Sequence, residues 1–407
     1  METRRPGRLW MFAAVVAFVP IVAVVTLGPD QAAPVASCDV LASLALPNGT
    51  ITGAEAIEAG AFAPPMRPGR SMSAGQRRQF EALPAFCRVT ATLTPSSDSE
   101  IKVEVWMPAT GWNGKMHAVG NGAFTGSHRY GSARSLASGL ERGYATASTD
   151  TGHEGGSASF ALGHPEKVID FGWRAVHEMT VTAKQVIAAF YGSGPEYSYW
   201  YGCSAGGRQA MMEAQRFPGD YDGIIAGAPG NDWTGRAAGS LRIANYLGAH
   251  EDAGLSAAKV ELVRMAVLEA CDAADGVIDK VVGDPERCAF DPAVLQCSGA
   301  DNGSCLTAAQ VNTVKMLYSS PENPKTGRAI TGVLPGSESN WTDLGWTRSA
   351  RASGLDQYRY LVYGDPEWTV DRFDFGTDIV RAEETDGGTL NALDPDLRPF
   401  FDRGGKL

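Results

Sequence analysis

The chain has 407 residues, of which 44% are hydrophobic and 20% are charged, and its formal net charge is −11 at pH 7. This composition is typical of a globular protein and excludes an intrinsically disordered one. The acidic balance argues against nucleic acid as a partner, because phosphate backbones attract clustered positive charge. The length exceeds that of a usual single domain, so we expect either one large domain with an insertion or two domains.

The N-terminal segment, residues 1–37, combines three arginines with an apolar run from residue 9 to residue 27. This pattern predicts an export signal, so we expect the protein to be secreted or periplasmic. The apolar run is also long enough to span a bilayer, which leaves an uncleaved anchor as the alternative. We expect contact with a membrane only in that second case.

Strand and helix patterns alternate in the segment 38–230. Five short runs favour β-strands, namely residues 102–107, 115–119, 144–150, 197–201 and 223–226. Apolar residues recur every three or four positions over 166–190, which predicts a long amphipathic helix, and residues 208–215 favour a second helix. This order predicts a mostly parallel sheet with helices on both faces, as in the core of an α/β-hydrolase fold.

The segment 231–390 has a different character, because turn residues and four of the seven cysteines replace the regular alternation. We expect it to be a lid that is inserted into the hydrolase core and covers the site. Trp341, Trp346 and Trp368 are its candidates for stacking on an aromatic substrate, although core packing is the commoner role of tryptophan. Residues 391–407 read as a return to the core, which we expect to be incomplete because the pattern at its end is that of a strand that only begins there.

Residues 202–206 form the motif Gly-x-Ser-x-Gly between a β-favouring and a helix-favouring run, with Ser204 at its centre. A strand, a sharp turn and a helix make a nucleophile elbow, in which glycines avoid clashes and the helix N-terminus stabilises negative charge. Ser204 is therefore the predicted nucleophile. The alternative is an ordinary glycine-rich turn with a solvated serine. We expect the backbone amides of Ala205 and of Gly122, or of its neighbour Ala123, to form the oxyanion hole.

A serine hydroxyl is a weak nucleophile unless a histidine removes its proton and an acid orients that histidine. In α/β-hydrolases both partners follow the serine in the chain. His250 is the one histidine after Ser204, and it is a weak candidate because it lies in the predicted lid, close to the elbow in sequence. His153 is a candidate for facing the pocket, with a structural role as the commoner outcome. We therefore expect the catalytic base to be absent from these residues.

An aspartate-rich loop occupies residues 271–285. Its candidate metal ligands are Asp272, Asp275, Asp279 and the carbonyls of Val277 and Val281. Calcium binds six to eight oxygen atoms, which such a loop is able to supply. The spacing is not that of an EF-hand, and a solvated Asp-Gly turn explains the composition equally well.

Disulfides are expected in an exported chain with seven cysteines. Cys271 with Cys288 and Cys297 with Cys305 would each close a short loop, but the sequence alone does not fix the connectivity. The odd number leaves one cysteine unpaired.

Several segments together resemble the tannase and feruloyl esterase family: residues 201–209, 217–229, 272–285, 334–338 and 394–407. The resemblance extends from residue 38 to residue 407. It implies an exported α/β-hydrolase with a large lid and a structural calcium ion, which cleaves esters of aromatic acids through an acyl-enzyme on Ser204. It also implies the calcium ligands Asp272, Asp275, Val277, Asp279 and Val281, and the disulfides Cys38–Cys87, Cys271–Cys288 and Cys297–Cys305.

In that family the cysteine before the serine is bonded to one that directly follows the catalytic histidine. The resemblance therefore implies that the partner of Cys203, the catalytic aspartate and the histidine all lie beyond residue 407. We accordingly expect little or no esterase activity from these 407 residues. The alternatives are a non-catalytic binding protein that keeps the fold and an acyltransferase or peptidase on the same scaffold. The sequence does not identify the preferred aromatic acid.

Overall fold

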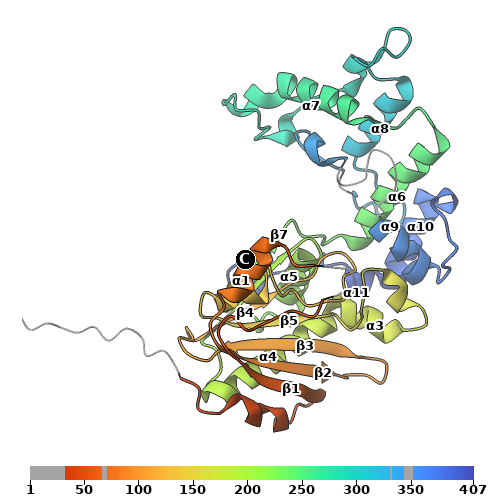
Figure 1. The fold of residues 1–407 in the computed structure, drawn as a ribbon. Helices are drawn as coiled ribbons and strands as arrows, with labels where there is room; N and C mark the ends of the chain where they lie inside the picture. Colours follow the sequence, from red (N-terminus) through yellow and green to blue (C-terminus); the bar gives the residue numbers. More distant parts are fainter. Residues whose placement is uncertain (1–32, 67–70, 331, 343–351) are drawn as a thin grey trace, which may run out of the picture.

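A computed structural model describes residues 33–66, 71–330, 332–342 and 352–407. Its centre is a seven-stranded sheet with the strand order β1-β2-β3-β5-β4-β6-β7 (Figure 1). The strands are β1 (Gly49–Ile57), β2 (Phe86–Leu93), β3 (Ile101–Pro108), β4 (Lys115–Val119), β5 (Ala145–Thr149), β6 (Tyr197–Cys203) and β7 (Gly223–Gly227). All five predicted strands are present, and the sheet is that of an α/β fold.

The sheet is parallel in one half and antiparallel in the other. β5, β4, β6 and β7 pair in parallel, whereas the pairs β1–β2, β2–β3 and β3–β5 are antiparallel. The expectation of a mostly parallel sheet is therefore wrong for three of the six pairs. β1 and β2 are absent from the predicted elements. The edge strand β1 gives a weak signal because no residue in it is fully buried.

Helices cover both faces of the sheet, as predicted. Along β3, Val105 and Met107 belong to the hydrophobic core that includes α4 (Ala175–Tyr191) and α5 (Ala205–Arg216). Trp106, between them, points to the other face and packs in a second core with α1 (Ala74–Glu81) and α2 (Leu136–Leu140). This alternation follows from the two-residue period of a strand.

The long helix predicted over 166–190 has three parts. α3 (Pro165–Ile169) leads into a π-helical turn, η3 (Asp170–Arg174), which continues as α4. Arg174 donates from Nε to the buried Asp170 at 2.6 Å within this turn. A π-turn leaves local carbonyls without their usual partners, and such turns occur at functional sites.

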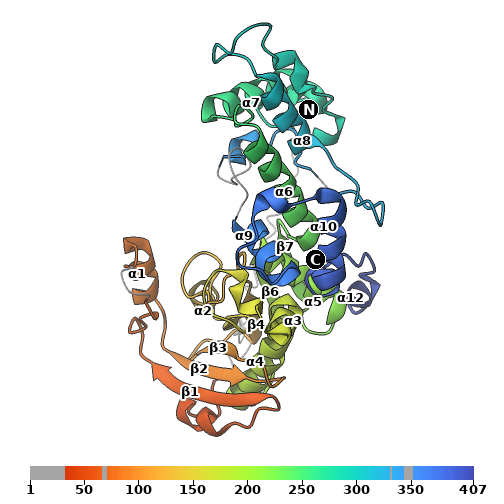
Figure 2. The ribbon, with the colours of Figure 1, turned by 90° about the vertical axis from the view of Figure 1, so that its right-hand side faces the viewer.

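The lid helices begin directly after β7. α6 (Trp233–Ala249) runs away from the sheet toward α7 (Ala257–Cys271) and α8 (Ala308–Tyr318), which lie at the far end of the molecule (Figures 1 and 2). α9 (Ala352–Asp356) and α10 (Phe375–Ala382) pack beside α6. The lid therefore has its own two hydrophobic cores, one around α6 and α10 and one around α7 and α8.

The chain returns to the sheet through α11 (Gly388–Leu390) and α12 (Arg398–Asp402). Lys406 forms a parallel bridge with Gly223 of β7, and its amide donates to the carbonyl of Asp222 at 2.9 Å. At the other end, most of the predicted export signal or anchor (1–37) lies outside the described residues. Within the part that is described, no helix combines the length and apolarity needed to cross a membrane.

Candidate active site

Ser204 lies at the turn between β6 and α5, as an elbow requires. Its φ of 62° and ψ of −118° place it in a region that a residue with a Cβ rarely adopts. Its amide donates to the carbonyl of Gly227 at 3.0 Å, and its carbonyl accepts from the amides of Arg208 and Gly230 at 3.0 and 3.1 Å. These bonds hold the turn while the Ser204 side chain remains exposed.

Glycines allow the elbow to pack closely against its neighbours. A Cβ on Gly202 would lie 2.1 Å from the carbonyl oxygen of Gly206, so the strand and the helix approach closely only without it. A Cβ on Gly120 would lie 2.6 Å from the Cα of Gly206. The amide of Gly206 also donates to the carbonyl of Asn121 at 2.9 Å. The motif therefore joins the elbow to the loop that follows β4.

That loop supplies candidate amides for an oxyanion. Ala123, with φ 47°, lines the same cleft as Ser204, whereas Gly122 lines a neighbouring cavity of about 420 Å³. Ala205 is the first residue of α5, where an amide has no carbonyl one turn earlier in the helix to bond. The assignment of the Ala205 and Gly122 amides to the oxyanion hole stays a prediction. Ala123, the alternative to Gly122, is the residue of that pair that lines the cleft.

Ser204 opens onto a cleft of about 780 Å³ whose walls come from both core and lid. Four charged residues line it: Asp232, Arg236, Arg242 and Arg328. Arg328 forms ion pairs with Asp232 and with Glu383, which neutralise its charge. The volume suits a small organic molecule.

None of the six histidines of the chain lines this cleft. His250 is exposed on the lid, where its ring stacks on Tyr246 at 4.2 Å between centroids. His153 is buried and its Nε2 donates to the carbonyl of Phe124 at 2.8 Å. Burial lowers the pKa of His153, which favours the neutral ring. His153 therefore supports the loop after β4 through its bond to Phe124 and does not face the cleft. Among the described residues, no histidine lies beside Ser204.

Arg208, one helical turn after the nucleophile, is a site residue that sequence reasoning misses. It is 0% exposed, and its guanidinium donates to the carbonyls of Phe171 (3.0 Å), Gly172 (2.7 Å) and Leu390 (3.3 Å). Its Cζ lies 5.0 Å from the ring of Phe171 and 5.2 Å from that of Trp233. Burial lowers its pKa to about 9. Arg208 thereby fastens α5 to the π-turn and to the end of the lid.

Comparison with known proteins identifies the family. Residues 87–407 match the model described as tannase and feruloyl esterase. The chain belongs to the tannase and feruloyl esterase family. An uncharacterized esterase of Xanthomonas campestris is 39% identical over 392 residues, covering 91% of this chain and 66% of that protein. Feruloyl esterase B of Aspergillus niger is 33% identical over 324 residues, covering 79% and 61%. The chain thus spans just under two thirds of the length of these curated relatives.

Solved structures of the family share the fold. Feruloyl esterase B from Aspergillus oryzae superposes with a TM-score of 0.80 at 29% identity, covering 91% of this chain and 72% of that one. Tannin acyl hydrolase from Aspergillus niger gives a TM-score of 0.63 at 21% identity, covering 89% and 70%. The second likeness shows the fold alone. Both support an α/β-hydrolase fold.

Two of the three tryptophans that were candidates for stacking on substrate lie in the lid cores. Trp341 and Trp368 are 0% and 1% exposed in the two lid cores, so both are packing residues, and the structure contradicts their proposed role. Trp346 lies outside the described residues. Trp233, at the start of α6, borders the cleft, but at 2% exposed it too packs in a hydrophobic core. It comes six residues after the end of β7, and this position after a parallel strand is the signal that would have found it.

The predicted calcium loop follows α7 in the lid. Asp272 accepts from the amides of Asp279 and Lys280 at 3.2 and 3.0 Å, and Asp275 accepts from the amide of Val277 at 2.9 Å. Asp279 accepts from Val281 at 3.0 Å. The hard oxygen donors fit calcium. In this conformation, however, the three carboxylates are not among the described groups whose ligand atoms converge within 4.8 Å. The calcium assignment stays a prediction.

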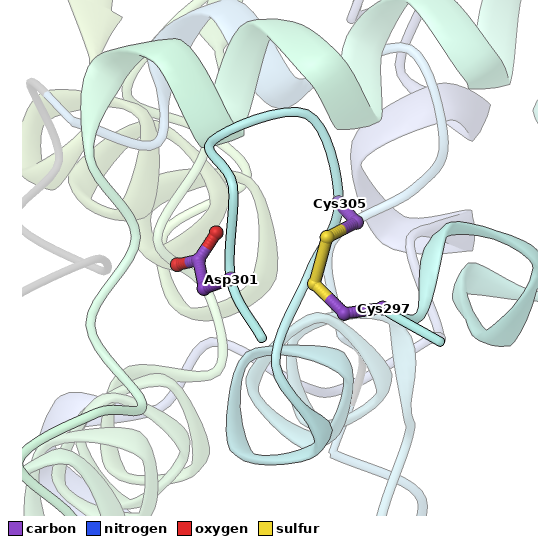
Figure 3. Close-up of side chains that lie close together, drawn as sticks. All are labelled: Cys297, Asp301 and Cys305. Carbon is purple, nitrogen blue, oxygen red and sulfur yellow. A yellow bond between two sulfur atoms is a disulfide. The ribbon is translucent and has the colours of Figure 1, made fainter. Parts of the chain in front are cut away.

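All three predicted cystines are present: Cys38–Cys87, Cys271–Cys288 and Cys297–Cys305. Figure 3 shows the last of them with Asp301 on the loop that it closes. Because both sulfurs are in the disulfide, this group offers no thiolate to a metal, and Asp301 instead pairs with Lys259 at 2.6 Å. Cys203 is unpaired, as the resemblance implies.

Proposed function

We propose that the protein is a serine carboxylic ester hydrolase that cleaves esters of aromatic acids through an acyl-enzyme on Ser204. The observation that carries this proposal is the exposed Ser204, held at a strained elbow and opening onto a cleft, in a chain of this family. Relatives bearing the name feruloyl esterase B support an aromatic acid as the acyl part.

The proposed reaction has two steps. Ser204 Oγ attacks the ester carbonyl and loses its proton to a base, and the amides of Ala205 and of Gly122 or Ala123 stabilise the oxyanion. Collapse releases the alcohol, which takes up the proton, and leaves the aromatic acyl group on Ser204. Water then attacks the acyl-enzyme and releases the acid. The described residues contribute the nucleophile and the oxyanion amides, whereas no histidine among them reaches Ser204.

A substrate panel tests this function. Gallate, ferulate and p-nitrophenyl esters should be hydrolysed by the protein as its gene encodes it, and Ser204→Ala should abolish turnover. The 407-residue chain alone should show only background rates, because no histidine of the described residues lines the cleft of Ser204. Turnover by that chain, abolished in Ser204→Ala, would contradict the predicted inactivity but not the hydrolase. No turnover by the gene product would favour the non-catalytic binding protein instead.

We further propose that the protein is exported and that the loop after α7 binds a structural Ca²⁺. The three disulfides support an oxidising compartment. On calcium binding, the loop carboxylates would give up their hydrogen bonds from loop amides and coordinate the ion instead; these carboxylates belong to Asp272, Asp275 and Asp279. EGTA should then lower the melting temperature, and Asp275→Asn should remove this response, whereas the exposed lid variant Asp371→Asn should keep it. An unchanged melting temperature and no calcium in elemental analysis would leave the loop a simple turn.

A further inference from the structure

Arg242, on the lid side of the cleft, is a cation that has no counter-ion among the described residues. Its Nη2 donates to the carbonyl of Met316 at 2.9 Å and to Ser319 Oγ at 2.8 Å, and both residues also line the cleft. Its Cζ lies 5.7 Å from the ring of Phe375. No carboxylate forms an ion pair with Arg242 in the described part of the chain, in contrast to Arg328 nearby. The guanidinium is therefore held in position, while no carboxylate of the described ranges compensates its charge.

The remaining donors of Arg242 also lack partners. Nε is buried without a hydrogen bond. Nη1 has no partner among the described residues either, yet it is not one of the buried unpaired atoms, so it reaches solvent in the cleft. A partly buried cation with unused donors is costly unless a charged group pairs with it. Burial accordingly lowers the pKa of Arg242. An anion that enters the cleft would supply the missing partner.

We propose that Arg242 binds a carboxylate of the substrate, so that the preferred substrates are aromatic esters with an anionic group remote from the scissile bond. This inference rests on the proposed function, because it takes the cleft of Ser204 as the substrate site. Arginine suits the role because its guanidinium stays charged and its donors match a carboxylate.

The helix geometry sets the reach of this contact. Arg242 lies nine residues after Trp233 on α6, which corresponds to about 13 Å along the helix axis. Because side chains lean toward the helix N-terminus, the guanidinium lies on the order of 10 Å along the axis from the start of α6, in the same cleft as Ser204. A substrate that spans this distance carries its carboxylate beyond an aromatic ring or an equivalent spacer.

Matched ester pairs test the proposal by binding alone. In the Ser204→Ala background, 4-(2-carboxyethyl)phenyl ferulate and its neutral primary amide would be titrated calorimetrically at low and high salt. The carboxylate should bind about 10- to 100-fold more tightly than the amide, as expected for hydrogen bonds to charged groups. Added salt should reduce this preference. The shorter pair, 4-carboxyphenyl ferulate and its amide, should show a smaller preference.

The added substitution Arg242→Gln should abolish the preference without weakening the amide, and Arg242→Lys should retain part of it. Arg264→Gln is the matched control, because Arg264 pairs with Glu261 on α7 and does not line the cleft. If the preference for the carboxylate ester persists in Arg242→Gln, or does not change with salt, the inference is wrong. Binding of the amide ester in that case would still support the cleft as the substrate site. If neither ester binds, both the inference and the substrate role of the cleft fail.

Discussion

Ser204 adopts an unfavourable backbone conformation, so replacing it by glycine should stabilise the protein. At φ 62° and ψ −118° a side chain costs about 1–3 kcal/mol, and glycine adopts these angles without that cost. Glycine also makes the unfolded chain more flexible, which costs about 0.4–1 kcal/mol. Taking about 2 kcal/mol against about 0.7 kcal/mol, Ser204→Gly should raise the free energy of unfolding by about 1 kcal/mol.

Two matched variants separate this effect from the loss of the hydroxyl. Ser204→Ala keeps the Cβ and should leave the stability nearly unchanged. Ala205→Gly, at the buried first position of α5, removes a methyl group and adds backbone freedom, so it should lower the stability by at least about 0.5–1 kcal/mol. Urea unfolding followed by tryptophan fluorescence and by circular dichroism would measure all three. If Ser204→Gly is no more stable than Ser204→Ala, the elbow stores no strain and the reasoning is wrong.

Two further substitutions test a buried carboxyl of the lid and a glycine beside the elbow. Burial raises the pKa of Asp386 from its ordinary 3.8 to about 7, so the folded state keeps a proton that the unfolded state loses, and stability falls as the pH rises from about 4 to 7. As the pH rises over that range, the free energy of unfolding of Asp386→Asn should increase relative to that of the wild type, by about 4 kcal/mol at most. Urea unfolding measures this difference, and a difference that does not change with pH would contradict the raised pKa. Gly120→Ala would place a Cβ 2.6 Å from Gly206 and should cost about 1–3 kcal/mol, whereas Gly219→Ala, with nothing within 4 Å, should cost far less; equal melting temperatures would refute the close packing.

The elements nearest the nucleophile are those that the sequence predicts best. The predicted strand 115–119 coincides with β4, and 197–201 covers most of β6. Both strands lie between parallel neighbours, and in both the buried residues alternate with more exposed ones, as the two-residue period of a strand predicts. β1 shows the opposite case, because no residue of this edge strand is fully buried and the glycines Gly49 and Gly53 weaken its strand pattern.

The contacts of the arginines are beyond the reach of sequence patterns. Arg208 belongs to a predicted helix, and a charged residue there is ordinarily expected at the surface. Its burial depends on the carbonyls of the π-turn at Phe171 and Gly172 and on Leu390, which lies 182 residues away. Arg328 likewise differs from Arg242 because the fold brings two carboxylates, Asp232 and Glu383, to Arg328 and no described carboxylate to Arg242. Local periodicity carries no information about such distant pairs.

The end of the lid next to the core is bonded to α5, the helix that begins after Ser204. These bonds limit which wall of the cleft is able to change with the substrate. The two chain crossings between core and lid are bonded to each other, because the amide of Thr234 donates to Asn391 at 3.0 Å and Asn391 Nδ2 donates to Thr234 Oγ1 at 2.8 Å. Gln215 of α5 donates to the carbonyl of Ala392 at 3.1 Å, and Arg208 of the same helix holds Leu390. A shift of the lid at this end would break bonds to the helix that positions Ser204. Differences in substrate preference are therefore expected from the far wall of the cleft, where Arg242 lies, and not from the fastened end.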